Sequence, residues 1–259
     1  MELTFYKYQG TGNDFILFDN RKNNLSLTEK QVKKLCDRKF GIGADGLILL
    51  SIKEGYDFEM IYYNADGTVS SMCGNGGRCM VRFAHDMGIH KNSYNFLAVD
   101  GAHEAEITTE NIIRLKMQDV TKIEHHFSHA ILNTGSPHYV KFCTNVRKMN
   151  VEEEGREIRY NDEFTGEGIN VNFVENTGSY SIYVRTYERG VEAETLSCGT
   201  GVTASALVSA HNEHGFNEVA VQTNGGKLSV EFNKIDENNF TQIYLCGAAT
   251  FVFKGIINL

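Results

Sequence analysis

Two stretches of this sequence follow one plan, and this duplication constrains the fold more than any other feature. Each stretch has an aromatic-rich strand pattern, a glycine turn, the motif Cys-Gly-X-Gly, a helix pattern and a glycine stop. The first is DFEMIYYNADGTVSSMCGNGGRCMVRFAHDMG, with Cys73, and the second is SIYVRTYERGVEAETLSCGTGVTASALVSAHNEHG, with Cys198, about half the chain length further on. The repeat predicts two similar units of helix and sheet, with one such cysteine in each.

The periodicity of apolar residues predicts the other elements. Helices are expected over residues 28–38, 78–87 and 202–212. Strands are expected over residues 3–8, 15–19, 46–51, 58–63, 94–99, 102–108, 111–118, 130–132, 138–142, 169–174, 180–188, 219–223, 227–232, 241–245 and 250–256. Charged sequence of low periodicity over about 119–127 predicts a crossover, which divides the chain into residues 1–119 and 120–249.

The overall charge argues against two classes of partner. The net charge is −8 and the sequence pI is about 5.6, and no cluster of lysine and arginine offers a local exception, so we expect no nucleic acid partner. The N-terminus has neither the basic start nor the apolar run of a secretory signal, and no segment is long and apolar enough for a bilayer. We therefore expect a cytoplasmic protein without a membrane partner.

The six cysteines are best interpreted as thiols. The chain has no export signal and no Cys-X-X-Cys pair, which disfavours a disulfide framework and the usual zinc-ribbon and thioredoxin sites. Four of the cysteines are interpreted as packing residues because they lie in apolar segments or have no counterpart in the other repeat: Cys36, Cys79, Cys143 and Cys246.

Two further patterns invite a cofactor or metal interpretation that their context does not support. The spelling Gly41-Ile-Gly43-Ala-Asp-Gly46 matches a dinucleotide loop, but that loop needs a strand before it and a helix after it, and here the order is reversed. His125, His126 and His129 lie in the polar crossover, where a solvated loop is the simpler interpretation. We therefore assign no metal and no dinucleotide.

Cys73 and Cys198 each stand immediately before a predicted helix. Unpaired N–H groups and the positive end of the helix dipole favour a negative charge there, so we expect a lowered thiol pKa. The N–H groups of the first helical residues are placed to hold a carboxylate, and those residues are Gly74, Asn75, Gly199 and Thr200. Two such thiols on opposite faces of one substrate carbon would remove a proton from one face and deliver one to the other, which inverts a stereocentre. The simpler alternative is that both turns are tight connections with cysteine as a filler.

The sequence resembles the diaminopimelate epimerases over essentially its whole length. The resemblance is carried by GTGNDF (10–15), FGIGADG (40–46), NADG (64–67), MCGNGGRC (72–79), GSPH (135–138), INVNF (169–173), YERG (187–190) and SCGTG (197–201). It implies cofactor-independent interconversion of L,L- and meso-diaminopimelate in lysine and peptidoglycan precursor synthesis by a homodimer. It also implies an α+β fold of two pseudo-symmetric halves, each a mostly antiparallel sheet curled around a central helix, with residues 250–259 returning to the first half.

The resemblance also implies roles for individual residues. Cys73 and Cys198 would be the acid/base pair, and His138 and Glu188 would tune the two thiols. The substrate-binding residues would be Asn13, Asn64, Gly74, Asn75, Ser136, Asn170, Glu188, Arg189, Gly199 and Thr200. Two positions depart from the family pattern, because Gly46 stands where many members have glutamine and Ser136 where many have asparagine.

Simpler readings exist for several of these side chains. Asn13 and Asn64 are also typical turn residues. Arg189 with Glu188 would make a solvated surface pair, and His138, which follows the only proline of the chain, would suit the start of a strand with its ring exposed.

Two other functions remain open from the sequence. One is another amino-acid racemase with the same pair of thiols, such as a proline racemase, although those enzymes typically have histidine where this chain has Asn75. The other is a thiol sensor in which Cys73 and Cys198 form a disulfide on oxidation.

Overall fold

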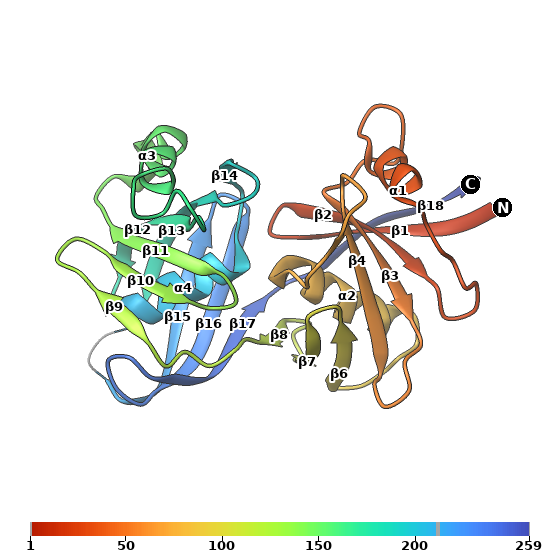
Figure 1. Ribbon diagram of the computed structural model, residues 1–259. Helices are drawn as coiled ribbons and strands as arrows, with labels where there is room; N and C mark the ends of the chain where they lie inside the picture. The colour runs from red at the N-terminus through yellow and green to blue at the C-terminus, as the bar shows by residue number, and fades with distance from the viewer. Residues whose placement is uncertain (1, 211–212, 259) are drawn as a thin grey trace. The chain divides into compact units, whose positions relative to one another are not determined.

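The computed structural model describes residues 2–210 and 213–258 and divides into two compact units (Figure 1). The N-terminal unit is formed by Met1–Leu115 with Gly247–Leu259, and the C-terminal unit by Lys116–Cys246. The boundary between the units, at Leu115 and Lys116, lies a few residues before the boundary expected from the sequence, which followed Asp119.

Among the described residues, each unit has two α-helices and a set of strands. The N-terminal unit has β1 (Glu2–Gly10), β2 (Asn13–Asp19), α1 (Glu29–Cys36), β3 (Gly46–Ser51), β4 (Phe58–Asn64), β5 (Val69–Ser70), α2 (Gly74–Asp86), β6 (Ser93–Ala98), β7 (Gly101–Ile107), β8 (Ile113–Lys116, which ends at the boundary) and β18 (Thr250–Asn258). The C-terminal unit has β9 (Ile123–His125), β10 (Ala130–Asn133), β11 (Pro137–Phe142), a short 3-10 helix (Val146–Lys148), α3 (Val151–Arg159), β12 (Asn170–Gly178), β13 (Ser181–Glu188), β14 (Ala193–Thr195), α4 (Gly199–Ser209), β15 (Gly215–Thr223), β16 (Gly226–Lys234) and β17 (Phe240–Gly247).

The two units share one pattern of strand pairing. In the N-terminal unit the neighbours run β18-β1-β2-β3-β4-β6-β7-β8, with β2–β3 and β4–β6 parallel and the other pairs antiparallel. In the C-terminal unit they run β9-β10-β11-β12-β13-β15-β16-β17, with β11–β12 and β13–β15 parallel. The match extends to the helices, because α2 and α4 occupy equivalent places in the two orders. The expected α+β fold of two pseudo-symmetric halves is confirmed.

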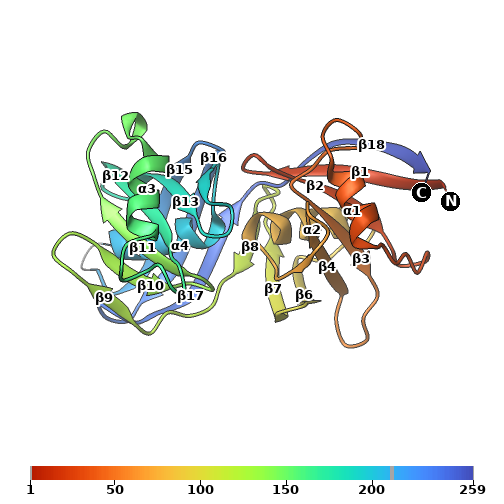
Figure 2. The same cartoon turned by 45° about the horizontal axis from the view of Figure 1, so that its top comes forward.

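Helices pack on both faces of each sheet (Figure 2). Val32 and Leu35 of α1 share a buried cluster with alternate residues of β2 and β3, among them Ile16 and Leu47. Ile48, which points to the other face, lies beside Gly76 of α2. All six residues of β3 are consequently buried, as expected for a strand covered on both faces.

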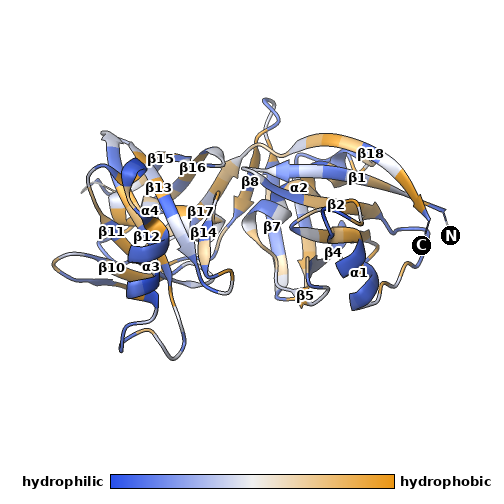
Figure 3. Ribbon diagram, turned by 90° about the horizontal axis from the view of Figure 1, so that it is seen from above, coloured by the Kyte–Doolittle hydropathy of each residue, from blue (hydrophilic) through white to orange (hydrophobic). Residues whose placement is uncertain are grey.

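The outer and central helices differ in polarity. α1 and α3 are mostly hydrophilic, as Figure 3 shows, whereas α2 and α4 bury most of their residues within the curl of the sheet. Within the described residues, none of the helices has the length and apolar character needed to cross a membrane.

Some boundaries differ from the sequence expectations. α2 and α4 begin at Gly74 and Gly199, earlier than expected, because their glycine-rich first turns have low intrinsic helix propensity and are helical through packing. The expected end of the second of these helices, at residue 212, lies outside the described residues. The short strand β9 lies inside the segment expected to be an irregular crossover.

The helix α3 was missed by the periodicity analysis, although its ends carry signals. Asn150 caps it by accepting from the Glu153 N–H and donating its own amide to the Glu153 carboxylate, at 3.4 and 2.8 Å. Acidic residues fill its first turn and arginines its last, which complements the helix dipole.

We predict that Gly155→Ala destabilises the C-terminal unit. An added Cβ would lie 2.4 Å from Tyr187 Cβ, so α3 would have to move away from β13, at a cost of about 1–3 kcal/mol. In an unhindered helix the same change stabilises by about 1 kcal/mol. Urea unfolding of Gly155→Ala, with the exposed Glu157→Ala as the control in the same helix, measures the sign, and a gain in stability would contradict this packing.

Candidate active site

The first candidate thiol caps the central helix of the N-terminal unit. Cys73 is the N-cap residue of α2, and its Sγ accepts a hydrogen bond from the Gly76 N–H at 3.2 Å. The Cys73 carbonyl accepts the Gly77 N–H at 2.8 Å, which begins the helix. The sulfur thereby satisfies one of the backbone N–H groups that a helix start leaves without an intrahelical partner.

Glycine allows close packing in this first turn. A Cβ at Gly76 would lie 3.1 Å from the Cys73 sulfur, and one at Gly77 would lie 2.8 Å from Met72 Sδ. The motif Cys-Gly-Asn-Gly-Gly therefore lets the sulfur approach the backbone of its own helix.

The second candidate thiol has the equivalent place in the C-terminal unit. Cys198 is the N-cap residue of α4, and its Sγ lies 3.5 Å from Thr200 Oγ1. Cys198 is only 8% exposed, because its sulfur lies against the first turn of its helix, whereas Cys73 is half-buried. Gly201 is again required, because its Cβ would lie 2.3 Å from Asn172 Oδ1.

In both units a threonine of the hairpin between the first two equivalent strands contacts the start of the central helix. Between β1 and β2, the Thr11 hydroxyl lies 3.1 Å from Asn75 Oδ1. Between β10 and β11, the Thr134 hydroxyl donates to the Thr200 carbonyl at 2.8 Å. Thr11 and Gly12 have φ values of 50° and 83°, the left-handed pair that a tight hairpin needs. This turn places Asn13 at the start of β2.

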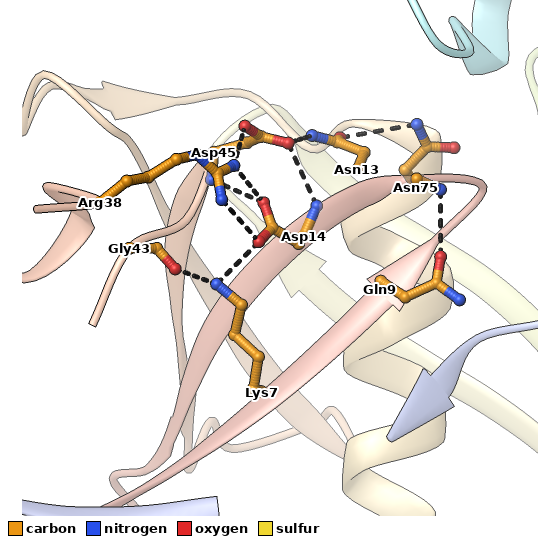
Figure 4. Close-up of polar contacts among 9 residues, drawn as sticks. Lys7, Gln9, Asn13, Asp14, Arg38, Gly43, Asp45 and Asn75 are labelled. Carbon is orange, nitrogen blue, oxygen red and sulfur yellow. Dashed lines mark hydrogen bonds and ion pairs between the residues drawn. The ribbon is translucent and has the colours of Figure 1, made fainter. Parts of the chain in front are cut away.

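The two asparagines of the N-terminal unit differ in their surroundings. Asn13 Nδ2 donates to the Asp45 carboxylate at 2.6 Å, and Asn75 Nδ2 lies 3.5 Å from Asn13 Oδ1 (Figure 4). Asn64 ends β4 and opens a turn, in which its carbonyl accepts the Gly67 N–H at 2.9 Å and its amide donates to Thr68 Oγ1 at 3.3 Å. Asn64 thus has the contacts of a turn residue, whereas Asn13 is part of a polar network with Asn75.

Three of the expected binding residues form one cluster in the C-terminal unit. Asn170 Nδ2 donates to Ser136 Oγ at 2.8 Å, and Asn170 Oδ1 accepts the Arg189 N–H at 2.9 Å. The Arg189 guanidinium donates to Ser136 Oγ at 3.3 Å and to the Glu167 carbonyl at 3.0 Å. The Ser136 hydroxyl therefore accepts hydrogen bonds from both the Asn170 amide and the Arg189 guanidinium.

His138 is buried and neutral. His138 lies in β11 and is fully buried, so the simpler interpretation of an exposed ring is wrong. Burial, reinforced by the charge of Arg189, lowers its pKa to about 3. Asn172 donates to the His138 Nδ1 at 3.1 Å and to the Tyr139 carbonyl at 3.0 Å, while the Thr186 hydroxyl donates to Asn172 Oδ1 at 2.9 Å. The proton of the ring is therefore on Nε2, which is buried without a hydrogen-bond partner in the described part of the chain.

Burial raises the pKa of Glu188 and of three cysteines outside the candidate pair. Burial raises the pKa of Glu188, which is half-buried at the end of β13 and is not part of a solvated pair. Burial also raises the pKa of Cys36 to about 11 and raises that of Cys79 and of Cys143. These three sulfurs are thiols at neutral pH, in keeping with packing roles.

The two rejected motifs have structural roles. The glycine-rich segment 41–46 follows α1 and leads into β3, the reverse of a dinucleotide loop. A Cβ at Gly46 would lie 2.5 Å from Cε2 of Tyr62, so the tyrosine ring fills the space of a side chain there. His126 stacks on His129 at 4.4 Å between centroids, and His129 stacks on Tyr139 at 4.2 Å.

Sequence reasoning missed several residues that hold these side chains in place. Asp45, Arg78 and Asn172 lie inside the motifs that carry the family resemblance, yet their types alone gave them no role. Arg78 is fully buried and donates to Asn75 Oδ1 at 2.9 Å and to the Gly74 carbonyl at 3.2 Å. Arg78 lies one turn into α2, so the helix predicted after Cys73 could have indicated that the arginine reaches back to the first turn.

Known structures with the same fold come from several enzyme groups. A PhzF-family phenazine biosynthesis protein of Bacillus anthracis matches with a TM-score of 0.77 at 14% identity, over 100% of both chains. A hydroxyproline epimerase of Agrobacterium vitis matches with a TM-score of 0.70 at 11% identity, over 100% of this chain and 93% of that one. At these identities the likeness establishes the fold.

Sequence comparison is more specific. The family model described as "Diaminopimelate epimerase" matches residues 5–123 and 130–252. The diaminopimelate epimerase of Flavobacterium psychrophilum is 50% identical, over 98% of this chain and 100% of that protein, and that of Chlorobaculum tepidum is 44% identical, over 96% and 99%. With its duplicated fold and a cysteine capping each central helix, the chain belongs to the diaminopimelate epimerase family.

Proposed function

We propose that the protein interconverts L,L- and meso-diaminopimelate by a two-base mechanism without a cofactor. The observation that carries the proposal is the equivalence of Cys73 and Cys198, each the N-cap residue of the central helix of its unit, in a chain of this family. Such a reaction would serve lysine and peptidoglycan precursor synthesis, as the resemblance implies.

In the proposed reaction one cysteine, as thiolate, removes the proton from the α-carbon. The electron pair remains on that carbon, stabilised by the adjacent carboxylate group, and the other cysteine, as thiol, delivers its proton to the opposite face. The N–H groups of Gly74, Asn75, Gly199 and Thr200 would hold that carboxylate, because helix N-termini favour anions. The two thiols exchange protonation states in each turnover, so the direction of reaction sets which one acts as the base.

The other expected residues would bind the substrate or tune the two thiols. Arg189, with its fork of donors next to Ser136 and Asn170, suits a carboxylate at the distal end of the substrate. His138 and Glu188 would tune the thiols, His138 as a neutral Nε2 donor. Asn13 and Asn64 would complete the binding site. We also propose that the protein acts in the cytoplasm and has no nucleic acid or membrane partner, in keeping with its net charge of −8.

Proton NMR of the purified protein with L,L-diaminopimelate in D2O tests the reaction. We expect meso product with solvent deuterium at the inverted carbon, while the remaining substrate keeps its proton early in the reaction, because each base serves one face. Equal exchange into substrate and product would contradict the two-base proposal. Exchange with proline or hydroxyproline alone would indicate a racemase of another substrate, and exchange with neither would favour a thiol sensor.

We predict that Cys73→Ala and Cys198→Ala each lower kcat by at least about 100-fold, the contribution typical of a positioned acid or base. Cys143→Ala, which removes a half-buried thiol outside the candidate site, should keep wild-type turnover. A stopped assay of meso product for the three variants makes the comparison, and robust turnover by either of the first two would exclude the proposed roles.

We predict that neutral burial of His138 makes stability fall as the pH falls from about 6.5 towards 3. In this window the unfolded chain binds a proton that the native ring excludes, which costs up to about 1.4 kcal/mol per pH unit. His138→Gln should reduce this slope. Urea unfolding of both proteins at pH 4.5, 5.5 and 6.5 measures it, and identical slopes would show that the ring is protonated in the native state.

We also propose that the protein is a homodimer that associates through β18. This strand exposes Phe251, Val252, Phe253 and Ile256, with exposed fractions of 45, 51, 45 and 63%. Apolar side chains exposed along a strand are typical of surfaces through which chains associate.

Light scattering should give twice the chain mass of 29.1 kDa for the wild type and the monomer mass for Val252→Asp/Ile256→Asp. Phe127→Asp, at a fully exposed phenylalanine outside β18, should remain a dimer. A monomeric wild type would exclude the homodimer, and a dimeric double variant would exclude β18 as the interface.

A further inference from the structure

A chain of polar contacts in the N-terminal unit joins two amides of the proposed site to two opposite charges. At one end, the Asp45 carboxylate accepts from Asn13 Nδ2 at 2.6 Å (Figure 4). Asn13 Oδ1 then faces Asn75 Nδ2 at 3.5 Å. At the other end, the Arg78 guanidinium donates to Asn75 Oδ1 at 2.9 Å. The path therefore runs from a carboxylate through two amides to a guanidinium.

Asp45 is held in place independently of Asn13. Its backbone N–H donates to the Asp14 carbonyl at 2.9 Å and to Asp14 Oδ1 at 3.2 Å. Its other carboxylate oxygen accepts from Arg38 Nη2 at 2.7 Å. Asp14 is itself paired with Arg38 at 2.6 Å and with the buried Lys7 at 2.8 Å. This cluster of charges places the Asp45 carboxylate beside the start of β2.

An ionised carboxylate only accepts hydrogen bonds, and a guanidinium only donates them. Asp45 therefore turns the NH2 group of Asn13 towards itself. Arg78, with the Thr11 hydroxyl at 3.1 Å, turns the Asn75 carbonyl inward, so the Asn75 NH2 group faces Asn13. Both amide orientations, which are otherwise free to flip, are fixed by groups of opposite charge. The 2.6 Å bond to Asp45 dominates the orientation of Asn13, since the Asn13–Asn75 contact is long.

We propose that Asp45 is a positioning residue that fixes Asn13 as a hydrogen-bond donor and thereby makes this part of the site selective for a carboxylate. The inference rests on the proposed function, in which Asn13 contacts substrate. With one Nδ2 hydrogen on Asp45 and its carbonyl turned towards Asn75, Asn13 presents its second Nδ2 hydrogen as a donor. A carboxylate accepts such a hydrogen, and an ammonium group does not.

The kinetic test compares Asp45→Ala with Arg38→Ala. Arg38 is 58% exposed and pairs with the same carboxylate without touching Asn13, and the hydrogen bonds from the Asp45 backbone N–H to Asp14 remain when Arg38 is replaced. We expect Asp45→Ala to raise the KM for diaminopimelate about tenfold, as for loss of one charged hydrogen bond, with a smaller change in kcat. Arg38→Ala should change KM less than twofold. Asp45→Asn, whose amide oxygen still accepts from Asn13, should recover part of the loss.

A double-mutant cycle separates positioning from a general structural effect. If Asp45 acts through Asn13, adding Asp45→Ala to Asn13→Ala should leave KM unchanged within twofold. Additive increases, or an unchanged KM in Asp45→Ala alone, would overturn the proposal. An inactive wild type would instead contradict the proposed function.

A spectroscopic readout needs no substrate. The side-chain 15N–1H2 resonance of Asn13, assigned by its absence in Asn13→Ala, should have one proton shifted downfield by the short bond to Asp45. We expect that shift to disappear in Asp45→Ala and to persist in Arg38→Ala. A resonance that does not respond to Asp45→Ala would show that the carboxylate does not hold the amide, whatever the enzyme's substrate.

Discussion

The structure depends on how the first turns of two buried helices satisfy their backbone N–H groups. α2 and α4 begin inside a curled sheet, where an unpaired donor is costly. In α2 the cap is a sulfur, since Cys73 accepts the Gly76 N–H, and in α4 Cys198 stands at the same place. The glycines allow close packing of these first turns, since a side chain at Gly76 would crowd the Cys73 sulfur and one at Gly201 would collide with Asn172. The cap of α2 thus puts a thiol beside a helix end that favours anions, and Cys198 has the equivalent position at the start of α4.

The two units share the backbone arrangement around the central helix but differ in the polar side chains that surround it. In each, a threonine from the first hairpin touches the first turn of the central helix, Thr11 at Asn75 and Thr134 at Thr200. Around this shared frame the N-terminal unit places a network of charges, including the buried Lys7 and Arg78. The C-terminal unit places a neutral histidine and its asparagine. Duplication therefore conserves the path of the backbone, while the polar side chains of the halves have diverged.

The sequence alone predicted the architecture well, for physical reasons. Repeated Cys-Gly-X-Gly motifs and apolar periodicity report local conformation, so they located both central helices and most strands. They failed where tertiary packing overrides propensity. Gly74 and Gly199 are helical despite their type, and α3 presents only two buried or partly buried hydrophobic side chains over its nine positions, Val151 and Ile158. The side chains that orient the site were not predictable, because Asp45 gains its role from a partner that the chain brings near by folding.

The strand order has a consequence for how the molecule is made. β18, close to the end of the sequence, pairs with β1, close to its beginning, and this strand is the counterpart of β9 in the other unit. β9 and its neighbours are local in sequence, so the C-terminal unit has all of its strands once residue 247 has been synthesised. The N-terminal unit is translated first but lacks a strand until β18, Thr250–Asn258, has been synthesised. The N-terminal unit, whose first strand opens the sequence, is thus the last of the two units to have all of its described strands.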